Sequence, residues 1–311
     1  MNRILVIRGG AIGDFILTLP AMKALREANP DARIDVLGYK HIAELANNRF
    51  YAASVRSIEY APLSRFFAKD SELSSDLKNY FASFDLVVSY LFDPDRIFEN
   101  NLRRCGIRQF VRGPAKIAPG EHAARQLAQP IEELGLKVDT SAAKLYPSAD
   151  DRQFARDFLE NCAGPMVAFH PGSGSEEKNW PLQNWIDLGD NLLGSSNFHG
   201  SIFVVCGEAD ATRTGRLKSI WSDSRVRFAE SLALPHLAAV LEHATFVGHD
   251  SGISHLAAAA GANCLLLFGP TNPAIWAPQG QNVRIMQAAG GDLRGLTVEI
   301  VQNAISTDFN W

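Results

Sequence analysis

The stretch Phe246-Val-Gly-His-Asp250-Ser-Gly-Ile-Ser-His255-Leu-Ala-Ala-Ala-Ala-Gly261 decides the fold of the second half of this chain. It predicts a buried strand, an abrupt turn and a short helix of small residues that packs closely on a sheet. Ser251 is a good N-cap, Gly252 lets a ligand approach the backbone, and Gly261 ends the helix. The first amides of such a helix lack intrahelical partners and lie at the positive end of its dipole, so the turn predicts a phosphate site. The alternative is an ordinary, well-capped βαβ crossover.

Length and composition place the chain among ordinary globular proteins. It has 311 residues, of which 46% are hydrophobic and 21% charged, and these values predict two domains with a core each. No run approaches the roughly 20 apolar residues of a membrane span, and the apolar run at 4–7 is too short for a signal peptide. The four scattered cysteines have no metal-ligand spacing and predict reduced, mostly buried thiols. We therefore expect a cytoplasmic protein without a metal site.

Short apolar runs alternate with helical patterns along the chain, which favours two α/β domains with parallel sheets. Strands are expected at 4–7, 34–37, 57–60, 85–90, 165–170, 201–206, 245–248 and 264–268. A polar stretch at 146–151 separates the halves and predicts domains at 1–148 and 149–311, the last helix being a candidate for packing back on the N-terminal domain. Two doubly wound domains would place a ligand cleft between the carboxyl ends of both sheets.

A glycine-rich turn, Gly9-Gly-Ala-Ile-Gly13-Asp14, follows the first strand and opens a helix that runs to about Ala28. It resembles a dinucleotide fingerprint, but its spacing is not G-x-G-x-x-G. The acid that would bind a ribose should end the second strand, whereas Asp35 lies within it. These departures argue against a Rossmann NAD site. Asp14 is instead a carboxylate held at a helix start, either as a functional group or as a plain N-cap.

A second polar turn follows the strand at 165–170, in His170-Pro-Gly-Ser173-Gly174-Ser-Glu-Glu-Lys178-Asn-Trp-Pro181. Its glycines and serines predict a phosphate cradle, and Lys178 supplies a compact positive charge just before a helix. The Gly-Lys-Ser/Thr of a Walker A loop is missing, so the turn is not a P-loop. A solvated surface lysine is the alternative for Lys178, and a structural role is the alternative for His255.

The first half contains a local basic region in a protein with a net charge of −4. Seven basic side chains face only Glu99 and Glu121 there: Arg96, Arg103, Arg104, Arg108, Arg112, Lys116 and Arg125. The region predicts either a solvated helix face with loops or a site for an anionic substrate. Nucleic acid is not expected, because the chain is acidic overall and has no recognisable binding motif. The triplet Asp93-Pro-Asp95 arises easily by chance and is not taken as a metal motif.

Taken together, the three turns resemble the lipopolysaccharide heptosyltransferases, glycosyltransferase family 9. The resemblance rests on the order of Gly9 to Pro20, His170 to Pro181 and Gly248 to Ala257, with Phe268-Gly-Pro-Thr271 after them. It implies two facing Rossmann-like domains with an interdomain cleft, the GT-B architecture. It also implies inverting, metal-independent transfer of a sugar, with heptose the expected one. The donor would be an ADP-sugar in the C-terminal domain, and the acceptor an anionic lipopolysaccharide core in the N-terminal domain.

The resemblance also assigns roles to residues. Asp14 would be the catalytic base, and Lys178 would stabilise the leaving pyrophosphate. The donor would be held by Ser173, Gly174, Lys178, Glu208, Asp250, Ser251, Gly252 and His255. The ADP-sugar is a substrate, so no cofactor is implied, and a glycolipid acceptor implies peripheral contact with the inner face of the plasma membrane. Two alternatives remain: an NAD-dependent dehydrogenase or epimerase, and a non-catalytic nucleotide-sugar-binding protein that would have no use for Asp14.

Overall fold

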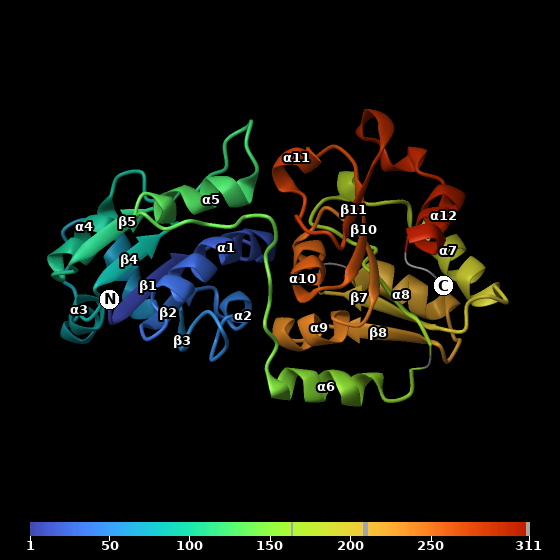
Figure 1. The fold of residues 1–311 in the computed structure, drawn as a ribbon, viewed down its shortest axis with the longest axis horizontal. Helices are drawn as coiled ribbons and strands as arrows, with labels where there is room; N and C mark the ends of the chain where they lie inside the picture. The colour runs from blue at the N-terminus through green and yellow to red at the C-terminus, as the bar shows by residue number, and fades with distance from the viewer. Residues whose placement is uncertain (163, 208–210, 309–311) are drawn as a thin grey trace. The chain divides into compact units, whose positions relative to one another are not determined.

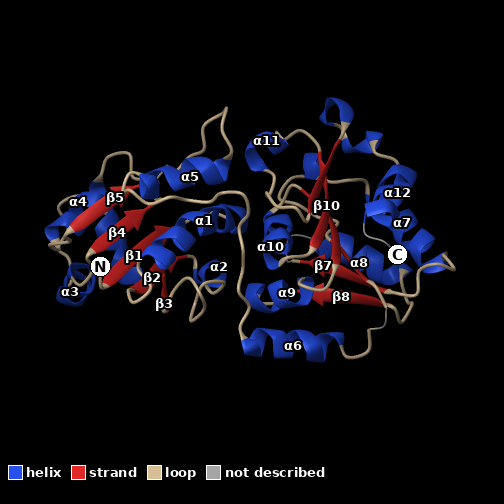
Figure 2. Ribbon diagram, viewed as in Figure 1, coloured by secondary structure: helices blue, strands red, loops and turns tan. Residues whose placement is uncertain are grey.

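The computed structural model of this chain describes residues 1–162, 164–207 and 211–308 (Figure 1). The chain divides into two compact units, Met1–Ser141 and Ala142–Trp311, called unit 1 and unit 2 below. Each unit holds one parallel sheet flanked by helices, as the alternating pattern predicts (Figure 2). Among the described residues, every helix is too short or too polar to cross a membrane.

The sheet of unit 1 has the strand order β3-β2-β1-β4-β5. Its strands are β1 (Arg3–Arg8), β2 (Arg33–Gly38), β3 (Ser54–Ser57), β4 (Leu86–Ser89) and β5 (Gln109–Arg112). The central strand β1 is fully buried from Ile4 onward and pairs with β2 and β4. The third strand was predicted at 57–60, but it lies three residues earlier, where Val55 pairs with Val36. The short β5 was not predicted, because its residues are half-exposed and show no apolar run.

Helices cover both faces of this sheet. They are α1 (Ile12–Ala28), α2 (Lys40–Ala43), the 3-10 helix η1 (Ala61–Phe67), α3 (Ser75–Ala82), α4 (Ile97–Arg104) and α5 (Ala123–Glu132). Helix α1 packs against α5, and α4 packs against η1. An aromatic core that includes Phe66, Phe81 and Phe98 joins η1, α3 and α4 to the sheet. This packing fixes the helix starts and loops at the carboxyl edge of the sheet.

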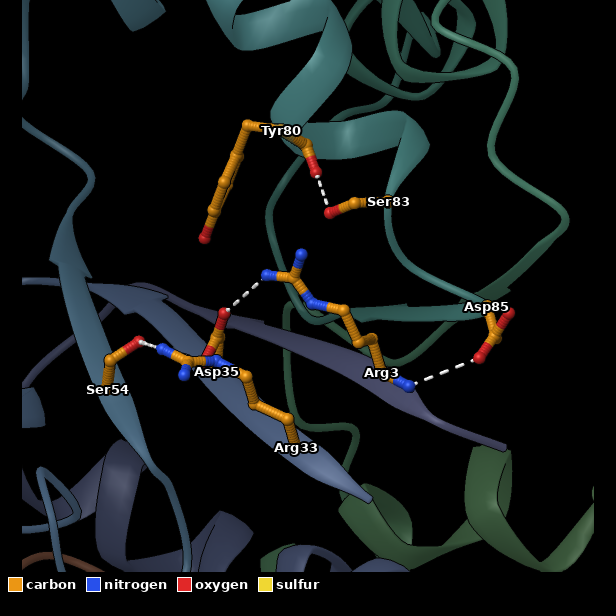
Figure 3. A network of polar contacts seen from close by, with 7 residues as sticks. All are labelled: Arg3, Arg33, Asp35, Ser54, Tyr80, Ser83 and Asp85. Carbon is orange, nitrogen blue, oxygen red and sulfur yellow. Dashed lines mark hydrogen bonds and ion pairs between the residues drawn. The ribbon is translucent and has the colours of Figure 1, made fainter.

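Asp35 lies inside β2, and its buried carboxylate is held by a network of polar contacts (Figure 3). Its carboxylate is 3.2 Å from the guanidinium of Arg3 and 3.0 Å from that of Arg33. The hydroxyl of Ser54 donates a third hydrogen bond to it at 2.8 Å. A carboxylate committed to these contacts ties three strands together. The sequence argument against a ribose-binding acid on β2 therefore has a structural counterpart.

The sheet of unit 2 has the order β11-β10-β9-β6-β7-β8. Its strands are β6 (Met166–Phe169), β7 (Ser201–Cys206), β8 (Val226–Glu230), β9 (Thr245–His249), β10 (Asn263–Phe268) and β11 (Val283–Gln287). The four strands predicted for this half are present within one or two residues at each end. The two edge strands β8 and β11 were not predicted, since both are only partly buried and each has an arginine, Arg227 or Arg284, as its second residue.

Helices again cover both faces of the second sheet. The described ones are α6 (Ala149–Leu159), η2 (Glu176–Lys178), α7 (Leu182–Gly194), α8 (Ala211–Ile220), α9 (Leu234–Leu241), α10 (Gly252–Ala260), α11 (Pro273–Trp276), η4 (Ala289–Gly291), η5 (Leu293–Gly295) and α12 (Val298–Asp308). Helix α6 packs against α9, and α12 packs against α7 within the same unit. The segment before α6 also belongs to unit 2, where the backbone N–H of Leu145 donates to the carbonyl of Ala259 at 2.7 Å.

Candidate functional site

The turn between β9 and α10 has the predicted form. Ser251 is the N-cap of α10, and its hydroxyl accepts a hydrogen bond from the backbone N–H of Ser254 at 3.3 Å. Gly261 ends the helix with a φ of +100°, a conformation that glycine adopts without strain. The N–H groups of the first turn have no partner within the helix and lie at its positive end. An anion at this position would be stabilised without any further side chain.

Lys178 reaches this turn from the loop after β6. Its ammonium nitrogen is 2.7 Å from the Asp250 carboxylate, although the two residues are 72 positions apart. The side chain of Lys178 is 31% exposed and that of Asp250 is 11% exposed, so Lys178 is not a freely solvated surface lysine. The contact with Asp250 holds the ammonium of Lys178 at the carboxyl edge of the sheet, beside the start of α10. Asp250 therefore holds a lysine here, a contact that the sequence did not suggest.

A second contact runs beside this ion pair. The backbone N–H of Trp180 donates to Nε2 of His249 at 2.8 Å, and the indole N–H of Trp180 donates to the carbonyl of Leu296 at 2.8 Å. Both Trp180 and His249 are fully buried. The sequence analysis did not single out either residue. The one available signal was that a histidine directly precedes Asp250 at the end of a buried strand.

The other described candidate residues of unit 2 follow β6 or β9. His170 is 4% exposed, and its Nδ1 lies 3.3 Å from the hydroxyl of Ser251, which links the ends of β6 and β9. Ser173 donates its hydroxyl to the carbonyl of Ser175 at 2.8 Å and so shapes the loop that contains Gly174. His255 is 5% exposed within α10. Glu208 lies outside the described residues.

Asp14 occupies the carboxyl edge of the other sheet. Helix α1 starts at Ile12, so Asp14 is the third helical residue, and the interpretation of Asp14 as the N-cap is wrong. Its Oδ2 accepts a hydrogen bond from the backbone N–H of Ala11 at 2.9 Å, while its Oδ1 lies 3.2 Å from the guanidinium of Arg8. Its side chain is 35% exposed, so a water-borne ligand can reach the carboxylate.

Arg8, at the end of β1, contacts both the backbone carbonyl and the carboxylate of Asp14. Its side chain is 5% exposed and donates two hydrogen bonds to the carbonyl of Asp14, at 3.2 and 3.1 Å. Burial lowers the pKa of Arg8, against the opposing effects of Asp14 and Tyr90. Arginine remains cationic in proteins, so a fixed positive charge sets the orientation of this carboxylate. The sequence analysis missed Arg8, because a basic residue that ends a strand carries no periodic signal.

Exposed aromatic side chains gather at the same edge of unit 1. Tyr39 follows β2, Tyr60 follows β3 and Phe92 follows β4, and they are 38%, 51% and 63% exposed. The ammonium of Lys116, which follows β5, lies 4.5 Å from the centre of the Phe92 ring. The carboxyl ends of parallel strands meet at one edge, so the segment with Asp14, after the central strand, lies between the segments that follow β2 and β4.

The basic region at 96–125 is mostly neutralised within unit 1. Arg103 and Arg112 pair with Glu99, Arg108 with Asp85, Arg125 with Glu121 and Glu132, and Arg104 hydrogen-bonds Asn101 and the carbonyl of Ser71. Burial raises the pKa of Glu99, but hydrogen bonds from Arg112 and Arg103 outweigh it and leave that pKa lowered. Arg108 also lies before β5, at the edge opposite Asp14. The interpretation of the whole region as an anion site is therefore too broad.

The D-x-D triplet has a structural role. The carboxylate of Asp93 accepts hydrogen bonds from the backbone N–H groups of Phe98 and Glu99, at 3.2 and 2.9 Å, and so caps α4. Within the part of the chain that the structure describes, no three His, Cys, Asp or Glu side chains are grouped so that they could hold a metal ion.

Comparison with known proteins bears on the family and the fold of the chain. The model of glycosyltransferase family 9 (heptosyltransferase) matches residues 107–294, a span that contains both turns of unit 2. Lipopolysaccharide heptosyltransferase 1 of Escherichia coli O18:K1:H7 is 24% identical, and the alignment covers 97% of each chain. The solved glycosyl transferase family 9 protein of Veillonella parvula superposes with a TM-score of 0.79 at 18% identity, covering 98% of this chain and 96% of that one. The E. coli heptosyltransferase WaaC with ADP gives 0.72 at 21% identity, covering 98% and 99%.

Proposed function

Since this chain belongs to glycosyltransferase family 9, the heptosyltransferase family, and has the two-sheet α/β fold of GT-B enzymes, we propose that it transfers heptose from an ADP-sugar to an anionic lipopolysaccharide-core acceptor. The observation that carries the proposal is the pairing of Lys178 with Asp250 beside the start of α10. A diphosphate needs such a combination of helix amides and a compact cation. The WaaC structure with ADP shares this fold over nearly its whole length.

The donor site is proposed in unit 2, at the carboxyl edge of its sheet. Ser173, Gly174 and Lys178 approach from the turn after β6, and Asp250, Ser251, Gly252 and His255 from the turn after β9. These two strands are neighbours in the sheet, so the two turns lie side by side. The N–H groups at the start of α10 face the diphosphate in this proposal, and Lys178 balances its charge.

The chemistry follows from where charge develops. Breaking the bond between the sugar and the diphosphate leaves negative charge on the departing oxygen, and the α10 amides and Lys178 stabilise that charge without a metal. The acceptor hydroxyl loses its proton to the Asp14 carboxylate as it attacks the anomeric carbon. A direct displacement of this kind inverts the configuration at that carbon. Arg8 holds the carboxylate in place for this step.

The acceptor surface is proposed at the carboxyl edge of unit 1. The side chains of Tyr39, Tyr60 and Phe92 are exposed there, and aromatic rings can pack against the apolar C–H side of a sugar ring. Lys116 adds a positive charge suited to an anionic group of the acceptor. The acceptor is a glycolipid in this proposal, so the same edge would meet the membrane surface that contains it.

ADP should stabilise the protein against unfolding. At a concentration of about 100 times its dissociation constant, a ligand that binds only the folded state adds about 2.7 kcal/mol. The measurement is the melting temperature with ADP, UDP, GDP and NAD compared at equal concentrations, followed by hydrolysis and transfer assays with the corresponding sugars. A shift with NAD and none with ADP would favour the dehydrogenase alternative and contradict the proposal.

Phe92→Ala should raise the KM for the acceptor by about 3- to 10-fold, because a stacking face is lost. The KM for the donor should not change, since the donor is proposed in unit 2. Ile220→Ala is the matched control: Ile220 is also an exposed apolar residue, at 42%, but it ends α8. An unchanged acceptor KM in the Phe92 variant would move the acceptor surface elsewhere. Arg108→Glu, at the opposite edge of the sheet, should leave both constants unchanged.

A further inference from the structure

Two neighbouring hydrogen bonds join the loop after β6 to the end of β9. The ammonium of Lys178 donates to the carboxylate of Asp250 at 2.7 Å, and the backbone N–H of Trp180 donates to Nε2 of His249 at 2.8 Å. The first contact is partly exposed and holds the lysine that faces the proposed diphosphate. The second is completely buried and joins a backbone group to a side chain. Together they fix the segment 178–180 at two points.

The buried contact has a fixed polarity. A backbone N–H can only donate a hydrogen bond, so Nε2 of His249 must accept one and carry no proton. His249 therefore needs the neutral tautomer with its proton on Nδ1. Phenylalanine would fill the same space and keep the edge-on ring contact with Trp185, whose ring centre is 5.3 Å away, but it would leave the N–H of Trp180 buried without a partner.

The rest of Trp180 is anchored independently of His249. Its indole N–H donates to the carbonyl of Leu296, and its ring packs edge-on against Trp185 at 5.4 Å. The contact with His249 is thus not needed to bury the ring. The hydrogen bond to His249 instead orients the backbone at Trp180. It thereby also sets the position of Lys178, two residues earlier in the chain.

We infer that His249 is a positioning residue for donor binding, which acts through the backbone of Trp180 to set Lys178 against the diphosphate. This inference rests on the proposed function. It assigns a role to a residue that does not itself touch the donor. Loss of the acceptor nitrogen lets segment 178–180 shift, so Lys178 meets the phosphates less well while the nucleoside is bound as before.

The test measures ADP and adenosine binding by calorimetry in five variants, one of them a double variant, and in the wild type. His249→Phe should weaken ADP binding by about 10-fold, roughly the contribution of one hydrogen bond between Lys178 and a charged phosphate oxygen, and should leave adenosine binding unchanged. His249→Gln, whose amide oxygen can accept from Trp180, should retain most of the ADP affinity. His236→Phe is the control, because His236 stacks on Phe154 at 4.1 Å, between α9 and α6.

The decisive arm is a double-mutant cycle with Lys178→Met. If His249 acts through Lys178, His249→Phe should cause no further loss of ADP affinity once the lysine is gone. An additive loss, an equal loss for adenosine, or undiminished ADP affinity in His249→Phe would each overturn the inference. If that variant does not fold, His249→Leu takes its place in the same cycle. If the wild type does not bind ADP, the donor proposal is overturned as well. If Lys178→Met weakens ADP binding but His249→Phe does not, only this inference is overturned.

Discussion

The Asp14→Asn protein should fold and bind ADP, yet its turnover should fall by at least about 100-fold, the lower end for losing a general base. Asparagine has nearly the shape of aspartate but cannot take up the acceptor proton. The structure also gives a cost in stability. One carboxylate oxygen of Asp14 accepts from the backbone N–H of Ala11 and the other forms an ion pair with Arg8, and an uncharged asparagine can keep the hydrogen bond but not the ion pair. We expect the free energy of unfolding to drop by about 1–2 kcal/mol, because a buried guanidinium loses a charged partner.

Asp151→Asn is the matched control for this experiment. Asp151 is also the third residue of its helix, and its Oδ2 accepts from the backbone N–H of Ser148 at 2.7 Å, as that of Asp14 does from Ala11. The control variant should keep its turnover, because it makes the same chemical change at the same position of a helix in unit 2. The measurements are kcat and the unfolding midpoint for both variants. A folded Asp14→Asn protein with near wild-type turnover would remove Asp14 from the mechanism and leave the reaction without a base.

The sequence predicted the parts of the fold that local patterns specify. The buried strands at 201–206 and 264–268 are continuous apolar runs, and the cap at Ser251 and the left-handed Gly261 are local backbone requirements. The edge strands β8 and β11 were not predicted, because most of their residues are only partly buried and neither strand forms a continuous apolar run. Their pairing depends on neighbours that are distant in sequence, which a local pattern does not contain.

The same limit applies to the candidate site. Lys178 and Asp250 were each selected from their own turn, but their mutual contact spans 72 residues and follows only from the pairing of β6 with β9. The prediction of an anion site across the basic region was too broad because it considered only charges close in sequence. Counting charges along 96–125 left out Asp85 and Glu132, which lie outside that window and neutralise Arg108 and Arg125. Strand–turn–helix patterns therefore predicted the local form of the turns at 170–181 and 248–257, whereas a count of charges along the chain did not predict which charged side chains pair in unit 1.

Lys178→Met should lower kcat/KM by about 100- to 1000-fold, the range for removing one group that stabilises charge on a leaving oxygen. The same change also leaves the Asp250 carboxylate, 11% exposed, without its cation. A loss of stability of about 1–3 kcal/mol should accompany it, because a largely buried charge has lost its partner. Activity and stability are thus expected to fall together in this single variant, so it cannot by itself separate the two roles of the lysine.

The double variant Lys178→Met with Asp250→Asn separates them. Asparagine removes the unpaired charge, so the unfolding free energy should return toward the wild-type value. Catalysis should stay as low as in the single variant, because nothing replaces the ammonium beside the diphosphate. The measurements are kcat/KM with the ADP-sugar and the unfolding midpoint for the three variants and the wild type. Recovery of activity along with stability would mean that the pair only holds the turns together. In that case the amides at the start of α10 alone would stabilise the charge on the leaving group.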